Sequence, residues 1–122
     1  MSDVSFIFEA IRNLIGGAVA AVGLMFMLGG ALGLLRFPDY YTRLHANSVA
    51  DGAGAAVFVL GLAVLAPDWS IAVRLMLLGA LIAMLAPTFA HLGANAAHSA
   101  GLAPLSGSYT APRPGAPPRS ER

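Results

Sequence analysis

The chain contains no cysteine and no lysine, and only 11% of its 122 residues are charged. The missing cysteines exclude disulfides, thiol chemistry and cysteine-bound metals. All seven cations are arginines scattered along the chain and the formal net charge is +1, so the sequence offers no basic stripe for nucleic acid. It also has no nucleophile with an evident base and no phosphate-binding loop, which argues against an enzyme.

Apolar residues and glycine are what the chain has in excess, at 57% hydrophobic residues with 14 glycines. A soluble domain of this length cannot bury so much apolar surface, whereas in a bilayer the apolar faces point to lipid and small residues let helices approach closely. We therefore predict an all-α membrane protein with one three-helix domain over residues 1–100. Five of the eight prolines fall in residues 101–122, which predicts a disordered tail.

The predicted membrane spans cover about 13–36, 42–66 and 71–97. The uncharged run 13–35 is about 35 Å long as a helix, enough to cross a hydrocarbon core of about 30 Å. Residues 1–12 form an amphipathic lead-in that either lies at the interface or extends the first helix. The uncharged run 52–66 is too short for the core, so we expect Asp51 to lie at or just inside the membrane boundary.

Small residues at helical spacing predict the faces on which the spans pack. On the first and third spans these are Gly16, Ala20, Gly23, Gly29, Gly30, Gly33, Gly79, Ala83 and Pro87. The proline is also expected to bend its helix.

Arginine counting predicts the orientation. Five arginines lie in the first turn and the tail and only two lie near the N-terminus and the second turn. The positive-inside rule then puts the N-terminus outside and the C-terminus in the cytoplasm.

The densest group of ionisable residues lies in the stretch 34–51, between the first two spans. A residue before proline leaves the helical region, so the first helix should end near Arg36 and Pro38 should fall in the first turn of the next. Asp39 would then stand at the positive end of the helix dipole. We expect Arg36, Asp39 and Arg43 to lock this hairpin and dock it to neighbouring subunits through charge-assisted bonds.

Four polar residues are candidates to border an ion path. They are His45, Asn47, Asp51 and His91. Asp51 is either an ion or proton relay or an interfacial residue paired to Arg43 or His91. His45 either titrates or bonds a partner subunit or a lipid headgroup. A metal site is not expected, because His91 and His98 are about 10 Å apart along a helix.

The run Gly33–Ala46, GLLRFPDYYTRLHA, resembles the signature of the small G-type component of Mrp-type multisubunit Na⁺/H⁺ antiporters, the MnhG/PhaG family. Three spans, the chain length and the Ala86-Pro87 pair before Ala90-His91 are also similar, so the resemblance covers about residues 13–103. Family members commonly carry a lysine and a threonine after the His-Ala, where this chain reads Asn47-Ser48-Val49-Ala50-Asp51-Gly52.

This resemblance implies an accessory subunit of a hetero-oligomeric cation/proton antiporter in the bacterial inner membrane. Its implied partners are large antiporter-like subunits, small E- and F-type subunits and lipid. Na⁺ and H⁺ are the ions moved by such a complex, and no cofactor is implied.

The sequence leaves three functions open. The chain is an accessory subunit that borders the ion path, a purely structural assembly subunit, or a homo-oligomeric, holin-like pore.

Overall fold

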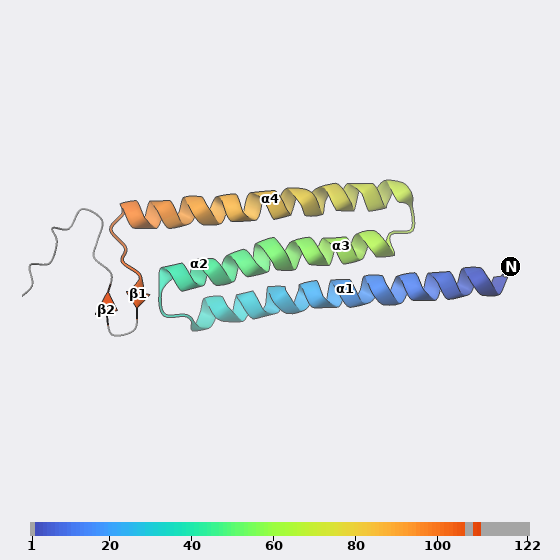
Figure 1. Cartoon of the computed structure of the whole chain (residues 1–122), viewed down its shortest axis with the longest axis horizontal. Coiled ribbons are helices and arrows are strands. Elements are labelled where there is room, and N and C mark those ends of the chain that lie inside the picture. The colour runs from blue at the N-terminus through green and yellow to red at the C-terminus, as the bar shows by residue number, and fades with distance from the viewer. Residues whose placement is uncertain (1, 107–108, 111–122) are drawn as a thin grey trace, which may run out of the picture.

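The computed structural model describes residues 2–106 and 109–110. Three long helical segments, 3–36, Tyr40–Leu65 and Trp69–Ser99, are long and apolar enough to cross a bilayer. They run antiparallel to their neighbours in a single row, with the middle segment flanked by the other two (Figure 1). The predicted all-α membrane architecture is confirmed. Because there are three crossings, the first and third segments run in the same direction.

The first helix, α1, spans Ser2–Arg36. It is longer than the predicted span 13–36 because the lead-in continues the same helix instead of turning onto the interface. At about 1.5 Å per residue its 35 residues measure roughly 52 Å, well beyond a hydrocarbon core of about 30 Å.

The middle segment consists of helix α2 (Tyr40–Ser48), a π-helix η1 (Val49–Gly54) and helix α3 (Ala55–Leu65). It begins two residues before the predicted span 42–66. Asp39 is the N-cap of α2 and takes an extended conformation, so Pro38 lies before the cap. The prediction that Pro38 falls in the first helical turn is wrong, because the cap residue must stay outside the helix for its side chain to reach back to the first amides.

The last helix, α4, spans Trp69–Ser99, slightly beyond the predicted 71–97, and continues through Pro87. The Thr88 hydroxyl donates to the Met84 carbonyl at 3.0 Å, one turn back, beside the break in backbone bonding that the proline makes. Gly101 ends the helix with φ 82°, and Leu102 N–H donates back to Ala97 O at 3.0 Å. This is a helix-terminating turn for which glycine is suited.

The chain after Gly101 was predicted to be disordered. Its described part contains a short antiparallel pair, β1 (Leu105–Ser106) with β2 (Tyr109–Thr110). Residues 107–108 and 111–122 lie outside the described residues.

Small residues line the contact between α1 and the middle segment. On α1 they are Gly16, Ala20, Gly23, Gly30 and Gly33, and they face Ala46, Ala50, Gly54, Phe58, Gly61 and Leu65. A Cβ on Gly23 would collide with the backbone of Phe58, and one on Gly61 would collide with the backbone of Ala20. The two helices therefore approach backbone to backbone along this line, a distance that only small residues allow.

The other predicted packing residues are placed differently. Gly79 is buried in α4, where a Cβ would lie 3.6 Å from Ala56 O. Ala83 and Pro87 are exposed, and a Cβ on Gly29 would meet nothing within 4 Å. Within this chain, the predicted small face of α4 is therefore reduced to Gly79.

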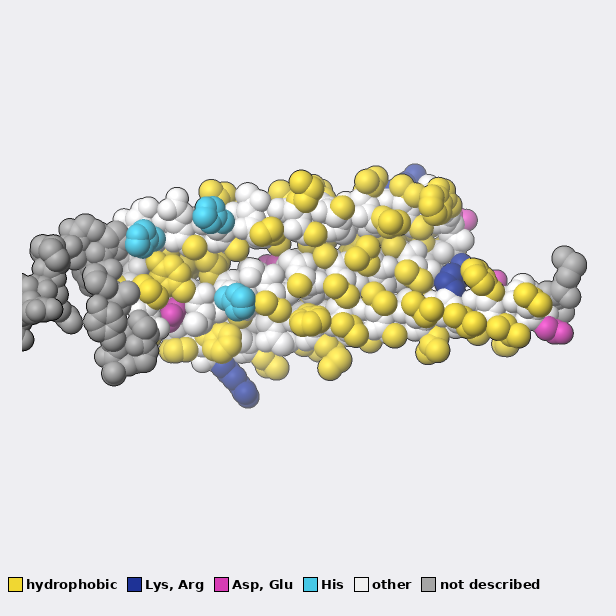
Figure 2. All heavy atoms as spheres, viewed as in Figure 1, with side chains coloured by type: hydrophobic (Ala, Val, Ile, Leu, Met, Phe, Trp, Pro, Cys, Tyr) yellow, Lys and Arg dark blue, Asp and Glu magenta, His cyan; other side chains and the backbone are white. Residues whose placement is uncertain are grey.

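Helices α1 and α4 do not contact each other in the described part of the chain. The molecule is thus one helix thick, and both of its broad faces lack a second layer. Hydrophobic side chains cover the surface along the length of the helices (Figure 2), as expected of a protein that meets lipid and other membrane subunits.

Candidate functional site

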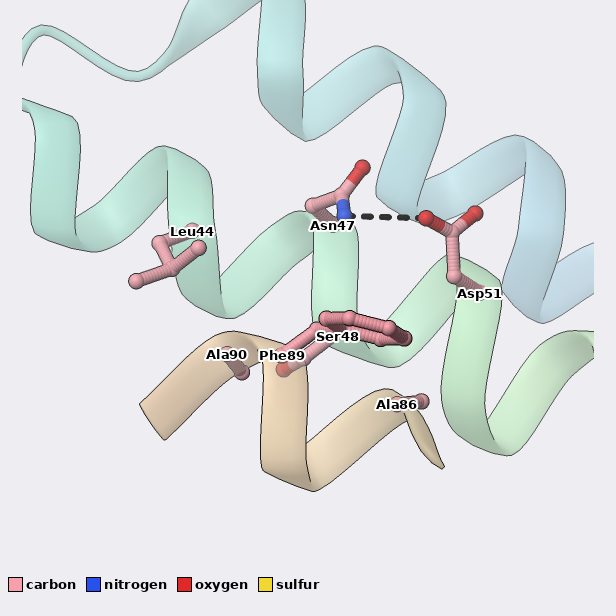
Figure 3. A pocket seen from close by; sticks show the side chains of 7 residues that line it. All are labelled: Leu44, Asn47, Ser48, Asp51, Ala86, Phe89 and Ala90. Carbon is pink, nitrogen blue, oxygen red and sulfur yellow. Dashed lines mark hydrogen bonds between the residues drawn. The ribbon is translucent and has the colours of Figure 1, made fainter. Parts of the chain in front are cut away.

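Asn47 and Asp51 form a polar pair on the middle segment. The Asn47 amide donates from Nδ2 to Asp51 Oδ2 at 2.9 Å, and the two side chains lie one turn apart (Figure 3). This is the only hydrogen bond to the Asp51 carboxylate among the described residues. An ionised carboxylate has about four acceptor sites, so most of its capacity is unused within this chain.

A cavity of about 140 Å³ lies beside this pair, between the middle segment and α4. It is lined by Leu44, Asn47, Ser48, Asp51, Ala86, Phe89 and Ala90 (Figure 3). A water molecule occupies about 30 Å³ of liquid, so the cavity has room for water next to a carboxylate. Carboxylate and amide oxygens are ligands that hard cations take.

The π-helix η1 carries Asp51. Its wide turn is closed by the Ala55 N–H, which donates to Ala50 O five residues back. Gly52 and Gly54 are buried in this turn, where a Cβ on Gly52 would lie 3.0 Å from Ala86 and one on Gly54 2.8 Å from Met27. Wide turns of this kind occur frequently at functional sites.

The π-helix also keeps the small residues in register with α1. From Ala46 to Leu65 the chain advances 19 residues, which is about 5.3 turns of regular α-helix, so the two side chains would point in different directions. When the wide turn takes up one extra residue, the number of turns between Ala46 and Leu65 falls to about 5.0, and both side chains can then face α1. Sequence reasoning missed the π-helix, because in a regular α-helix the small residues at 46, 50, 54 and 61 already fall within about 80° of one another, so their spacing gave no signal of a wide turn.

The middle segment is longer than the uncharged run that it contains. It is one continuous helix of 26 residues, about 39 Å long, that starts at Tyr40, and Asp51 is about 16 Å from that start. Counting only the uncharged residues 52–66 therefore underestimated the helix length available to cross a bilayer. The expectation that Asp51 lies at or just inside the membrane boundary stays a prediction. A charged aspartate costs about 2.5–3.5 kcal/mol at the bilayer centre and less near the boundary.

Within this chain, Asp39 and Arg43 form contacts at the start of α2, and the docking of the hairpin to neighbouring subunits stays a prediction. The Asp39 carboxylate is buried and accepts from Tyr41 N and, at 3.1 Å, from Thr42 N. Arg43 Nε donates to Phe37 O at 2.7 Å, which ties α2 to the turn before it. Arg36 is exposed at the end of α1. Asp39 and Arg43 thus form contacts within the turn, whereas Asn47 and Asp51 bond to each other further along the segment.

The histidines lie apart from the polar pair. His45 precedes Asn47 by two residues, a rotation of about 200° around the helix, and lines a different cavity of about 350 Å³. His91 is exposed on α4 and does not line the Asp51 cavity. Histidines of α2 and α4 are visible on the face drawn in Figure 2. No group of three or more His, Cys, Asp or Glu residues suited to a metal ion occurs in the described ranges.

Comparison with known proteins agrees with the sequence signature. A family model described as Na⁺/H⁺ antiporter subunit, PhaG_MnhG_YufB, matches residues 19–98. The chain belongs to this family of antiporter subunits. The match includes the hairpin, the polar pair and part or all of each of the three membrane-spanning segments, so this antiporter subunit is a multi-pass membrane protein.

Two relatives show how far the similarity extends. A UPF0091 protein of Pyrococcus horikoshii is 42% identical over 82 residues, which are 67% of this chain and 80% of that protein. A probable G-type subunit of a K⁺/H⁺ antiporter from Rhizobium meliloti is 44% identical over 52 residues, 39% of this chain and 43% of that protein.

Two solved complexes contain chains of the same fold as this antiporter subunit. A chain of the Mrp complex from Dietzia sp. DQ12-45-1b superposes with a TM-score of 0.72 at 34% identity, covering 80% of this chain and 88% of that one. A chain of the membrane-bound sulfane sulfur reductase, an archaeal respiratory membrane complex, superposes with a TM-score of 0.69 at 27% identity, covering 79% and 89%.

Proposed function

We propose that this chain is a small accessory subunit of a multisubunit monovalent cation/H⁺ antiporter in the bacterial inner membrane. The observation that carries this proposal is the family match over residues 19–98 together with the similarity to a chain of the Mrp complex. Large antiporter-like subunits and small E- and F-type subunits are its proposed partners. The proposed orientation has the N-terminus outside and the C-terminus in the cytoplasm, following the arginine distribution.

The Asn47–Asp51 pair is the part of this chain proposed to border the cation path. It combines a carboxylate, the side-chain amide of Asn47 and an adjoining cavity of about 140 Å³, about 16 Å along a membrane-spanning segment. His45 and His91 are assigned to the margins of the subunit, since neither lines this cavity. The ions moved by the complex are a monovalent cation, Na⁺ or K⁺, and H⁺.

The test compares two substitutions that remove one negative charge each. Asp51→Asn keeps the size and hydrogen bonding of the side chain, and Asp39→Asn keeps a good N-cap outside the span. In everted vesicles with equal complex abundance, Asp51→Asn is expected to lower cation/H⁺ exchange and Asp39→Asn to leave it near wild type. Equal exchange in both variants would indicate a structural assembly subunit instead.

A second candidate function follows from the sulfane sulfur reductase neighbour. The same fold is used there in a respiratory complex, so this chain is alternatively a subunit of an ion-translocating module driven by redox chemistry. Purification of the native complex distinguishes the two, because redox subunits would be present only in the second.

A further inference from the structure

Asp51 lies on a broad face of the molecule that nothing in this chain covers. Because α1 and α4 do not touch in the described part of the chain, the middle segment is open on two opposite sides. Asn47 and Asp51 lie on one of these sides, together with the exposed ring of Phe89 across the cavity. We define this side, by Asn47, Asp51 and Phe89, as the Asp51 face.

Lipid is an unsuitable cover for this face. Asp51 lies about 16 Å along a membrane-spanning segment of about 39 Å, and its side chain is much shorter than that of a lysine or arginine, which can extend to the headgroups. Ionisable groups within membrane-spanning segments face a bundle interior or a water-filled cavity. The carboxylate therefore needs a protein or an enclosed water path on its open side.

This chain does not supply the missing donor itself. The described arginines lie toward the helix ends, with Arg36 and Arg43 by the first turn and Arg12 and Arg74 by the opposite end. A second copy docked through the same face would set Asp51 against Asp51, and like charges in a low dielectric repel. Charge complementarity thus favours a different chain.

We propose that the Asp51 face is the surface on which a transmembrane helix of another subunit docks, and that this helix presents a hydrogen-bond donor or a cationic side chain to Asp51. The inference rests on the proposed function, because it requires a hetero-oligomeric complex. Beyond the proposed function, the inference specifies which face of this chain another subunit covers and which kind of side chain that subunit presents. The cavity beside Asp51 then becomes an enclosed space between two subunits.

Photocrosslinking in the whole complex in native membranes tests the proposal. A photoreactive p-benzoylphenylalanine replaces Phe89, which is 65% exposed on the Asp51 face, or Met84, which is 73% exposed. The two positions share a helix and lie about 140° apart around it. We expect the probe at 89 to crosslink to another subunit in at least several-fold higher yield than the probe at 84. Equal yields, no crosslink at 89, or a crosslink to a second copy would overturn the proposal.

Substitutions at Asp51 give a second readout that does not depend on transport. Asp51→Leu leaves the partner's donor unpaired, so the crosslink at 89 is expected to weaken about three- to thirtyfold, the range of interhelical hydrogen bonds in membranes. Asp51→Asn keeps a hydrogen-bonding group and should retain the crosslink. If lipid covered the face, Asp51→Leu would instead be tolerated or stabilising. Mass identification of the copurifying subunits distinguishes failure of the proposed function from failure of the proposed docking surface. If antiporter-like partners copurify but the probe at 89 gives no crosslink, only the assignment of the Asp51 face as a docking surface is refuted.

Discussion

The contact between α1 and the middle segment yields a quantitative prediction from one pair of glycines. Gly17 and Gly23 are both in the interior of α1, but only Gly23 meets the middle segment. A Cβ on Gly23 would overlap backbone atoms of Phe58 and lie 2.9 Å from Gly54 O, whereas a Cβ on Gly17 meets nothing within 4 Å. Gly23→Ala therefore pushes two helix backbones apart, and Gly17→Ala adds a methyl group in open space.

The two substitutions are expected to change the folding free energy in opposite directions. Overpacking a close contact costs about 1–3 kcal/mol. Replacing an unconstrained helical glycine by alanine gains about 0.5–1 kcal/mol. The two variants should differ by roughly 1.5–4 kcal/mol in folding free energy. At about 2–8 °C per kcal/mol, the range for chains somewhat longer and shorter than this one, the midpoints should be separated by at least about 3 °C.

The assay is the thermal midpoint of the solubilised complex, read as loss of this chain from the complex peak on size exclusion. Gly23→Ala should lower the midpoint, and Gly17→Ala should leave it unchanged or raise it. Equal midpoints would refute the backbone-to-backbone approach of α1 and α3.

Three further predictions concern the local structures around the site. Deletion of Ala53 converts the wide turn η1 to regular α-helix and keeps Ala46 and Leu65 facing α1, so chain abundance should stay near wild type. Insertion of one alanine after Ala53 rotates Gly61 about 100° away from Ala20 and should reduce abundance sharply on a membrane immunoblot. A lower abundance of the deletion variant than of the insertion variant would contradict the proposed register of the middle segment against α1. Asp39→Ala removes the cap bonds to Tyr41 N and Thr42 N and should destabilise the chain by about 0.5–2 kcal/mol in the same thermal assay, while Asp39→Asn should cost little. Tyr41→Phe loses the hydroxyl bond to Leu102 O at 2.9 Å and should speed amide hydrogen exchange in residues 101–105; no difference from Tyr40→Phe would show that this bond does not hold the segment.

The architecture could be predicted from the sequence because membrane spans depend on length and apolarity alone. The spacing of Gly16, Ala20, Gly23 and Gly30 also indicated a packing face, and the structure places these residues against the middle segment. These properties are local, so no knowledge of the partner helix was needed.

The start of the middle helix at Tyr40 and the wide turn could not be predicted in the same way. The wide turn depends on how the middle segment keeps register with α1 over several turns, which is a relation between distant segments. The separation of Asn47 from His45 likewise follows from helix rotation and from the position of α4, which forms the other wall of the cavity. Sequence reasoning placed His45 and Asn47 in one group because they are only two residues apart in the chain.

The most direct test of the central claim is gentle solubilisation of native membranes, capture of this chain through a tag, and mass identification of the proteins that copurify. The account predicts large antiporter-like subunits together with other small membrane subunits in one complex. Recovery of the chain alone, as a homo-oligomer that conducts ions by itself, would contradict it.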